Sequence, residues 1–150
     1  MEIRVGSAIE LQEEAARFAS RIVPHASAAT IIALSGELGA GKTTFTQGIA
    51  KALGVDESVT SPTFVIEKIY ALHDQKFARL IHVDAYRLES AHELEVLGWH
   101  EIASDAANLI LIEWPEKVAT LIPEGAIRIR FDIAGEGRII SINGVEENNT

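Results

Sequence analysis

The feature that most constrains this chain is a glycine-rich segment that meets the pattern G-x-x-x-x-G-K-[ST] in full. Its eight residues are Gly36, Glu37, Leu38, Gly39, Ala40, Gly41, Lys42 and Thr43. Glycines at these positions let a loop fold with its backbone N–H groups pointing at a phosphate, and a following helix adds its own free N–H groups. The lysine supplies a charge to the outer phosphates and the threonine hydroxyl can ligate magnesium. The segment, with Thr44 next to it, therefore predicts a site for ATP and Mg²⁺.

The residues around this segment have the context that such a loop requires. Thr30 to Leu34 is a short apolar run, typical of a buried parallel strand. Lys42 to Leu53 has apolar residues at helical spacing, and Gly54 follows where a helix commonly ends. A strand, a loop and a helix in this order make a chance match the weaker interpretation.

The remaining pattern predicts an α/β fold, a P-loop NTPase with a mixed sheet. Strands are expected at Glu2 to Gly6, Val65 to Leu72, Phe77 to Val83, Leu109 to Ile112, Ile127 to Ile133 and Ile139 to Ile142. Helices are expected after Ser7, whose spacing to Glu10 is that of a capping box, from Ser90 through Trp99, and from Pro115 to near Pro123. Strands that alternate with helices favour a parallel centre, and hairpins favour antiparallel edges.

Length and composition exclude several other classes. The 150 residues, 47% of them hydrophobic, predict a single domain over 1–150, with 146–150 as a flexible tail. The absence of cysteine rules out disulfides and cysteine-ligated metals. A formal charge of -9 disfavours direct binding to a nucleic-acid backbone. We expect neither a signal peptide nor a bilayer span, because no apolar stretch is long enough.

Two acidic residues stand at the ends of apolar strands. Asp84 follows the run Leu80 to Val83, and Glu113 follows Leu109 to Ile112. Enzymes with this loop usually place a carboxylate at such a strand end to hold magnesium, and it is usually Asp. One of the two could hold the metal while the other orients or deprotonates the attacking water, and the pattern leaves open which does which.

Several other residues carry weaker signals. Thr63, in the turn Ser61 to Phe64, could lie near the terminal phosphate, although an ordinary proline turn is the better interpretation from the residues alone. Trp114 could lie beside the nucleotide, but a tryptophan after a buried strand more often packs. His82 alternates with apolar residues, which favours a hydrogen-bonded core histidine over a ligand. The D-x-x-G at Asp132 to Gly135 is interpreted as a strand and a turn, because the chain has no N-K-x-D.

Four motifs together resemble the bacterial TsaE family. They are G-E-L-G-A-G-K-T-T from Gly36, T-S-P-T-F from Thr60, H-V-D-A-Y-R from His82 and L-I-E-W-P-E from Leu111. The resemblance implies a small cytoplasmic ATPase needed for threonylcarbamoyladenosine in tRNA, with a central parallel sheet flanked by antiparallel strands. It implies that the protein docks on the TsaB–TsaD heterodimer, which performs the transfer, and resets or regulates it, so that tRNA is reached only through that complex.

The same resemblance implies a role for each matching residue. Lys42 and the loop backbone would bind the phosphates, and Thr43 and Glu113 would hold magnesium. Asp84 would activate water or bind the metal through water. Thr63 would lie near the terminal phosphate and Trp114 beside the nucleotide.

Two alternatives remain open from the sequence. A small-molecule kinase would use the same loop, but the one candidate lid, Glu89 to Ala107, has histidines as its only basic residues. A nucleotide-switched binding module would bind ATP with negligible hydrolysis.

Overall fold

The computed structural model describes residues 1–37, 40–56 and 67–144. Its strands are β1 (Glu2–Val5), β2 (Thr30–Gly36), β3 (Glu67–Ala71), β4 (Arg79–Asp84), β5 (Asn108–Glu113), β6 (Ile127–Ala134) and β7 (Gly137–Asn143). Its helices are α1 (Ala8–Arg21), α2 (Lys42–Ala52), α3 (Ala91–Val96), α4 (Trp99–Ala103) and the 3₁₀ helix η1 (Pro115–Leu121). Leu38, Gly39, Thr63 and the expected tail lie outside the described residues.

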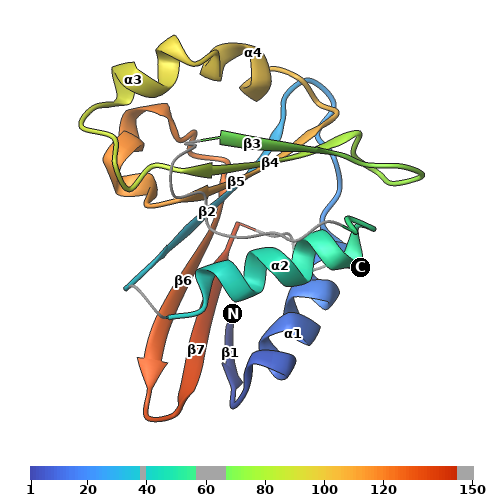
Figure 1. Ribbon diagram of the computed structural model, residues 1–150, viewed down its shortest axis with the longest axis vertical. Coiled ribbons are helices and arrows are strands. Elements are labelled where there is room, and N and C mark those ends of the chain that lie inside the picture. Colours follow the sequence, from blue (N-terminus) through green and yellow to red (C-terminus); the bar gives the residue numbers. More distant parts are fainter. Residues whose placement is uncertain (38–39, 57–66, 145–150) are drawn as a thin grey trace.

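The described strands form one mixed sheet in the order β1-β7-β6-β2-β5-β4-β3. The four central strands, β6, β2, β5 and β4, are parallel, while β3 at one edge and β7 and β1 at the other are antiparallel. This arrangement confirms the expected parallel centre with antiparallel edges. The carboxyl ends of β2, β4 and β5 consequently meet at one end of the sheet (Figure 1).

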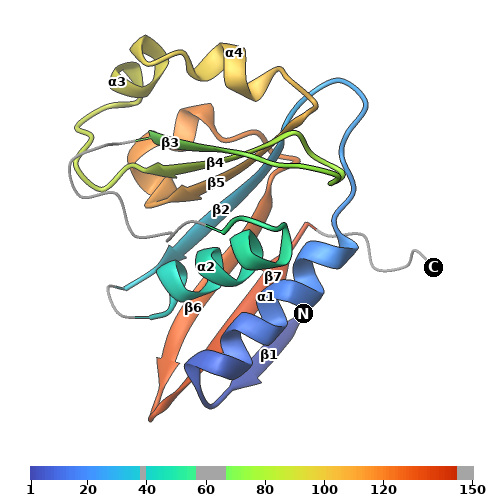
Figure 2. The same cartoon turned by 45° about the vertical axis from the view of Figure 1, so that its right-hand side comes forward.

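Helices cover both faces of the sheet. α1 and α2 pack on one face of the sheet. There the Phe45 ring contacts Phe18 in a tilted arrangement and Phe131 in an edge-to-face arrangement, at centroid distances of 5.7 and 5.4 Å. α3, α4 and η1 pack on the other face, where Leu94 and Trp99 are buried against the central strands. The two pairs of helices lie on opposite sides of the sheet in Figures 1 and 2. No helix in the described ranges is both long and apolar enough to cross a bilayer.

The start of α1 follows the expected cap closely. The Ser7 hydroxyl accepts a hydrogen bond from the Glu10 N–H at 3.1 Å. The Glu10 carboxylate accepts a hydrogen bond from the Gly6 N–H at 2.9 Å. In a standard capping box the donor would be the N–H of the cap residue itself, here Ser7. Leu11 and Phe18 are buried as the helical spacing predicts.

The helix expected from Ser90 through Trp99 is wrong in its extent. α3 ends at Val96, Gly98 adopts a left-handed conformation (φ 92°), and α4 begins at Trp99. Ser90 occupies the cap position, but its hydroxyl makes no capping bond within the described chain. Phe77 also differs from its expectation: it precedes β4 and is buried in the core from a turn.

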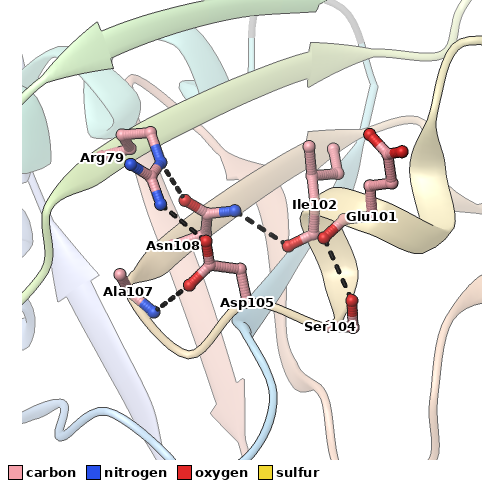
Figure 3. Close-up of polar contacts among 7 residues, drawn as sticks. All are labelled: Arg79, Glu101, Ile102, Ser104, Asp105, Ala107 and Asn108. Carbon is pink, nitrogen blue, oxygen red and sulfur yellow. Dashed lines mark hydrogen bonds and ion pairs between the residues drawn. The ribbon is translucent and has the colours of Figure 1, made fainter.

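A polar cluster fixes β4 against β5 at the end of the sheet opposite Asp84 and Glu113 (Figure 3). The Arg79 guanidinium donates to Asn108 Oδ1 and to Asp105 Oδ2, both at 2.7 Å. Asn108 is buried, and its amide donates to the Ile102 carbonyl of α4 at 2.9 Å. Because Arg79 and Asn108 are register partners, the same register places Asp84 opposite Glu113 five residues along.

Candidate functional site

The glycine-rich loop begins and ends at positions that only glycine fits. Gly36 has a φ of 144°, and a Cβ there would lie 2.6 Å from the Phe131 carbonyl oxygen. Gly41 has a φ of 111°, and a Cβ there would lie 2.6 Å from Leu11 Cδ2. Both φ values are ones that residues with a side chain rarely adopt. A side chain is therefore excluded at both Gly36 and Gly41.

Lys42, the first residue of α2, is a buried cation. Its side chain is 4% exposed, and Nζ donates to the Gly36 carbonyl at 2.6 Å. The same Nζ lies 3.8 Å from the centroid of the Trp114 ring. Burial lowers the pKa of Lys42, and the nearby carboxylates oppose that decrease only in part. The ammonium group thus has a carbonyl and a ring face in place of water, and can exchange the carbonyl for an anionic oxygen.

The start of α2 offers further donors. Gly41 occupies the cap position and has no side chain to satisfy the first N–H groups of the helix, and no acid lies in the first turn. Thr43 and Thr44 are both half-buried there. A helix start of this kind favours a bound anion.

The two predicted carboxylates lie side by side. Asp84 and Glu113 end β4 and β5 and are direct register partners. Glu113 is also paired with Leu34 in the loop-bearing strand β2. Both carboxylates, and Glu116, partly oppose the decrease that burial causes in the pKa of Lys42. The structure therefore brings Lys42, Asp84 and Glu113 together as the sequence predicted.

Glu113 is held by a buried histidine. Glu113 is 3% exposed and His82 is 0% exposed, and His82 Nε2 lies 2.6 Å from Glu113 Oε2. His82 Nδ1 is buried with no hydrogen-bond partner among the described residues. The expectation of a hydrogen-bonded core histidine is confirmed, and its partner is the candidate metal ligand. A metal-ligand carboxylate fixed by a second residue is a common arrangement.

Asp84 is more exposed to solvent than Glu113. It is half-buried, and its Oδ1 accepts a hydrogen bond from the Tyr86 N–H at 2.9 Å. One carboxylate is thus locked in the core while the other borders solvent.

Trp114 has an unusual backbone. Its φ of 59° and ψ of 51° are left-handed values, which cost about 1–3 kcal/mol in a residue other than glycine. Its ring lies against Lys42 and is 5.1 Å from the Tyr86 ring. The residues alone favoured a packing role for Trp114. The ring does pack against Tyr86, and it also covers Lys42.

The donor set fits magnesium in its chemistry. Thr43, Asp84 and Glu113 offer only oxygen atoms, and Mg²⁺ is usually held by one or two carboxylates with substrate phosphates and waters. Within the described residues no three His, Cys, Asp or Glu side chains form a metal cluster by themselves. A cation here would therefore be held jointly by these side chains and a bound phosphate.

Two site residues were missed by the sequence analysis. Glu116 lines a cavity of about 490 Å³ beside Gly36 and Glu37, and Asp132 of β6 lines the same cavity. Asp132 reaches the loop because Gly36 pairs with Phe131. The interpretation of Asp132 to Gly135 as strand and turn is confirmed, since β6 ends at Ala134.

The fold and this geometry together define a P-loop NTPase-like protein with a lysine and two strand-end carboxylates around the loop. Comparison with known proteins identifies its family. The family model of the threonylcarbamoyl adenosine biosynthesis protein TsaE matches residues 9–140, and the chain belongs to this family.

Individual relatives agree with this assignment. A tRNA threonylcarbamoyladenosine biosynthesis protein TsaE from Streptomyces coelicolor is 42% identical over 80% of this chain and 83% of its own length. That of Borreliella burgdorferi is 39% identical over 76% and 81%, respectively. A crystal structure of Bacillus subtilis YdiB superposes with a TM-score of 0.76 at 30% identity, covering 97% of this chain and 86% of that one.

Proposed function

We propose that this chain is a magnesium-dependent ATPase, weak alone, that supports threonylcarbamoyladenosine modification of tRNA by binding and resetting or regulating the TsaB–TsaD transferase. The observation that carries the ATPase part is the buried Lys42, which lies at a helix start between the loop carbonyl of Gly36 and a pair of carboxylates. Membership of the TsaE family supports the pathway.

Lys42 binds the outer phosphates in this proposal. Its ammonium group leaves the Gly36 carbonyl and donates to phosphate oxygens, while the Trp114 ring keeps one side of it dry. A cation shielded from water attracts phosphate more strongly than an exposed one. The N–H groups at the start of α2 hold the same phosphates.

Hydrolysis then needs a positioned water. The water oxygen forms a bond to the terminal phosphorus, and the bond from that phosphorus to the bridging oxygen of ADP breaks. Asp84, which borders solvent, orients this water and takes up the proton that is later released. His82 holds the Glu113 carboxylate in place through their contact of 2.6 Å. Thr43 and Glu113 would hold magnesium, which would neutralise part of the phosphate charge.

The acidic surface supports action through partners. With a formal charge of -9, the chain is poorly suited to binding tRNA directly. A protein that acts on the TsaB–TsaD pair in the cytoplasm does not need to bind tRNA itself.

The kinase alternative is weakened by the position of the candidate lid. α3 and α4 pack on the sheet face opposite α2, so they do not cover the loop (Figure 1). His92 and His100 in this segment lie 3.9 and 2.9 Å from Glu95 of the same segment.

Phosphate release from ATP and magnesium, measured with and without the purified TsaB–TsaD pair, tests the proposal. Strong stimulation by the pair is expected. Release that stays negligible with the pair and tRNA present would favour the nucleotide-switched module. Transfer of phosphate to an added nucleoside or sugar would favour the kinase.

A further inference from the structure

One face of the three strands β1, β7 and β6 is left uncovered by the described helices. Side chains along a strand alternate between the two faces of a sheet. Val5, Ile140 and Phe131 point to the face that packs against α1 and α2. The described helices α3, α4 and η1 cover a separate core, to which no described residue of β1, β6 or β7 belongs. In Figures 1 and 2, α3 and α4 lie at the β3, β4 and β5 end of the sheet, away from β7 and β1.

The uncovered side, called the outer face below, carries charged and polar side chains around one isoleucine. By the alternation along the paired strands it consists of Glu2, Arg4, Arg128, Arg130, Asp132, Ile139, Ser141 and Asn143. Each of these residues is exposed or half-buried. An antiparallel sheet can leave such a face to water, so a binding role has to follow from the arrangement of the charges.

The strand registers order these charges in rows across the outer face. Two neighbouring rows each take one residue from β1, one from β7 and one from β6. The first row is Arg4, Ile139 and Asp132, and the second row is Glu2, Ser141 and Arg130. Each row has opposite charges at its two ends. The positive end of the first row is on β1, whereas the positive end of the second row is on β6.

This pattern is complementary to itself. A two-fold axis along β7 places the β1 side of one copy opposite the β6 side of another copy. Arg4 then faces Asp132 of the second copy, and Glu2 faces Arg130 of the second copy. Each contact occurs twice, as in any symmetric interface between identical chains. Ile139 lies against Ile139 of the second copy, which gives the interface an apolar centre and a charged rim.

The larger cavity gives a further reason for a cation to bind on the β6 side. Asp132 and Arg130 belong to the outer face and also line that cavity. Its other charged lining residues are Glu37 and Glu116, so acids outnumber bases there. The Arg130 side chain already lies 3.3 Å from Asp132. The remaining acidic charge attracts a cation from outside the chain, and Arg4 of a second copy supplies one.

We propose that the outer face binds a second copy of this chain, in a symmetric dimer whose two-fold axis runs along β7. The dimer goes beyond the proposed function and does not depend on nucleotide. It brings Arg4 of each copy to the acidic cavity beside the glycine-rich loop of the other. The face spans only short strands, so the dimer is a weak and reversible one.

Sedimentation equilibrium without nucleotide tests the dimer, over about 10 μM to about 1 mM protein in about 0.15 M salt. Arg4→Glu and Asp132→Arg should each weaken association about tenfold or more, because each change puts like charges together twice. The double variant should return to within about threefold of the wild type, because opposite charges face each other again. Arg21→Glu changes the net charge as Arg4→Glu does, but on the exposed surface of α1, and should associate as the wild type does.

Cross-linking gives an independent reading, because the chain has no cysteine of its own. Ser141→Cys places a thiol close to the proposed axis with little change in side-chain size, and Arg21→Cys places one on α1. A short bismaleimide should join two copies of Ser141→Cys but not of Arg21→Cys.

Several results would overturn the dimer. They are a wild type that stays monomeric over this range, association that Arg4→Glu weakens no more than Arg21→Glu does, a double variant no better than the single ones, and equal cross-linking of the two cysteine variants.

Discussion

Replacing His82 by Phe tests whether the buried histidine is needed to keep Glu113 in place. His82 and Glu113 are 0% and 3% exposed and 2.6 Å apart, so water cannot replace the lost partner. Leaving a buried polar group unsatisfied costs about 1–3 kcal/mol. We expect a loss of roughly 3 kcal/mol in the free energy of unfolding, at the upper end of this range, because both residues are fully buried.

Urea denaturation followed by circular dichroism, without nucleotide, measures this loss. The control is His100→Phe, because His100 also contacts a glutamate, at 2.9 Å, but on the surface. Its free energy of unfolding should stay within about 0.5 kcal/mol of the wild type.

The double variant His82→Phe with Glu113→Leu separates pairing from packing. Replacing both members of a buried pair by apolar residues is often neutral, so most of the stability should return. Two results would refute the reasoning. One is a single variant as stable as the His100 control, and the other is a double variant less stable than His82→Phe alone.

Four further predictions concern the loop and its surroundings. Lys42→Ala should lose tight ATP binding, because the phosphates lose their buried cation, and unchanged affinity by calorimetry would contradict the phosphate-loop assignment. Asp84→Asn should bind ATP but release phosphate slowly, and normal turnover would make Asp84 structural. Gly41→Ala should lower the free energy of unfolding by about 1–3 kcal/mol, measured in urea, because φ is 111° and Leu11 blocks the Cβ. Burial raises the pKa of Glu67, so the charged carboxylate lowers the free energy of unfolding at neutral pH. Glu67→Gln should therefore raise the free energy of unfolding at neutral pH. This gain should vanish below the ordinary glutamate pKa of about 4.3, where the carboxyl group is protonated in both the folded and the unfolded chain.

The sheet and the central site were predictable because their signals are local. Asp84 and Glu113 each follow an apolar run, which predicted that they end strands. Neighbouring parallel strands end at the same edge of a sheet, so the two acids were expected to lie close together. The loop motif then fixed Lys42 beside them. Each step needed only the neighbouring residues and a general rule of sheet geometry.

Other parts depend on contacts between distant segments. The bond from His82 to Glu113 requires the register of β4 on β5, which is fixed partly by Arg79 and Asn108. Asp132 reaches the loop only because β6 lies next to β2, an order that the sequence does not specify. The break between α3 and α4 had a local signal in Gly98, whose conformation ends the helix.

The order of the strands also has a consequence for synthesis. β1 lies at the edge of the sheet, and its ladder partner in the described sheet is β7: Ile3 pairs with Ile140, and the Met1 N–H donates to the Ile142 carbonyl at 3.1 Å. On the ribosome, β1 is therefore made long before β7, the strand with which it pairs. α1 follows β1 directly, yet its buried face needs α2 and the sheet. Contacts so distant in sequence slow folding, and β1 stays unpaired and open to aggregation until β7 has been made.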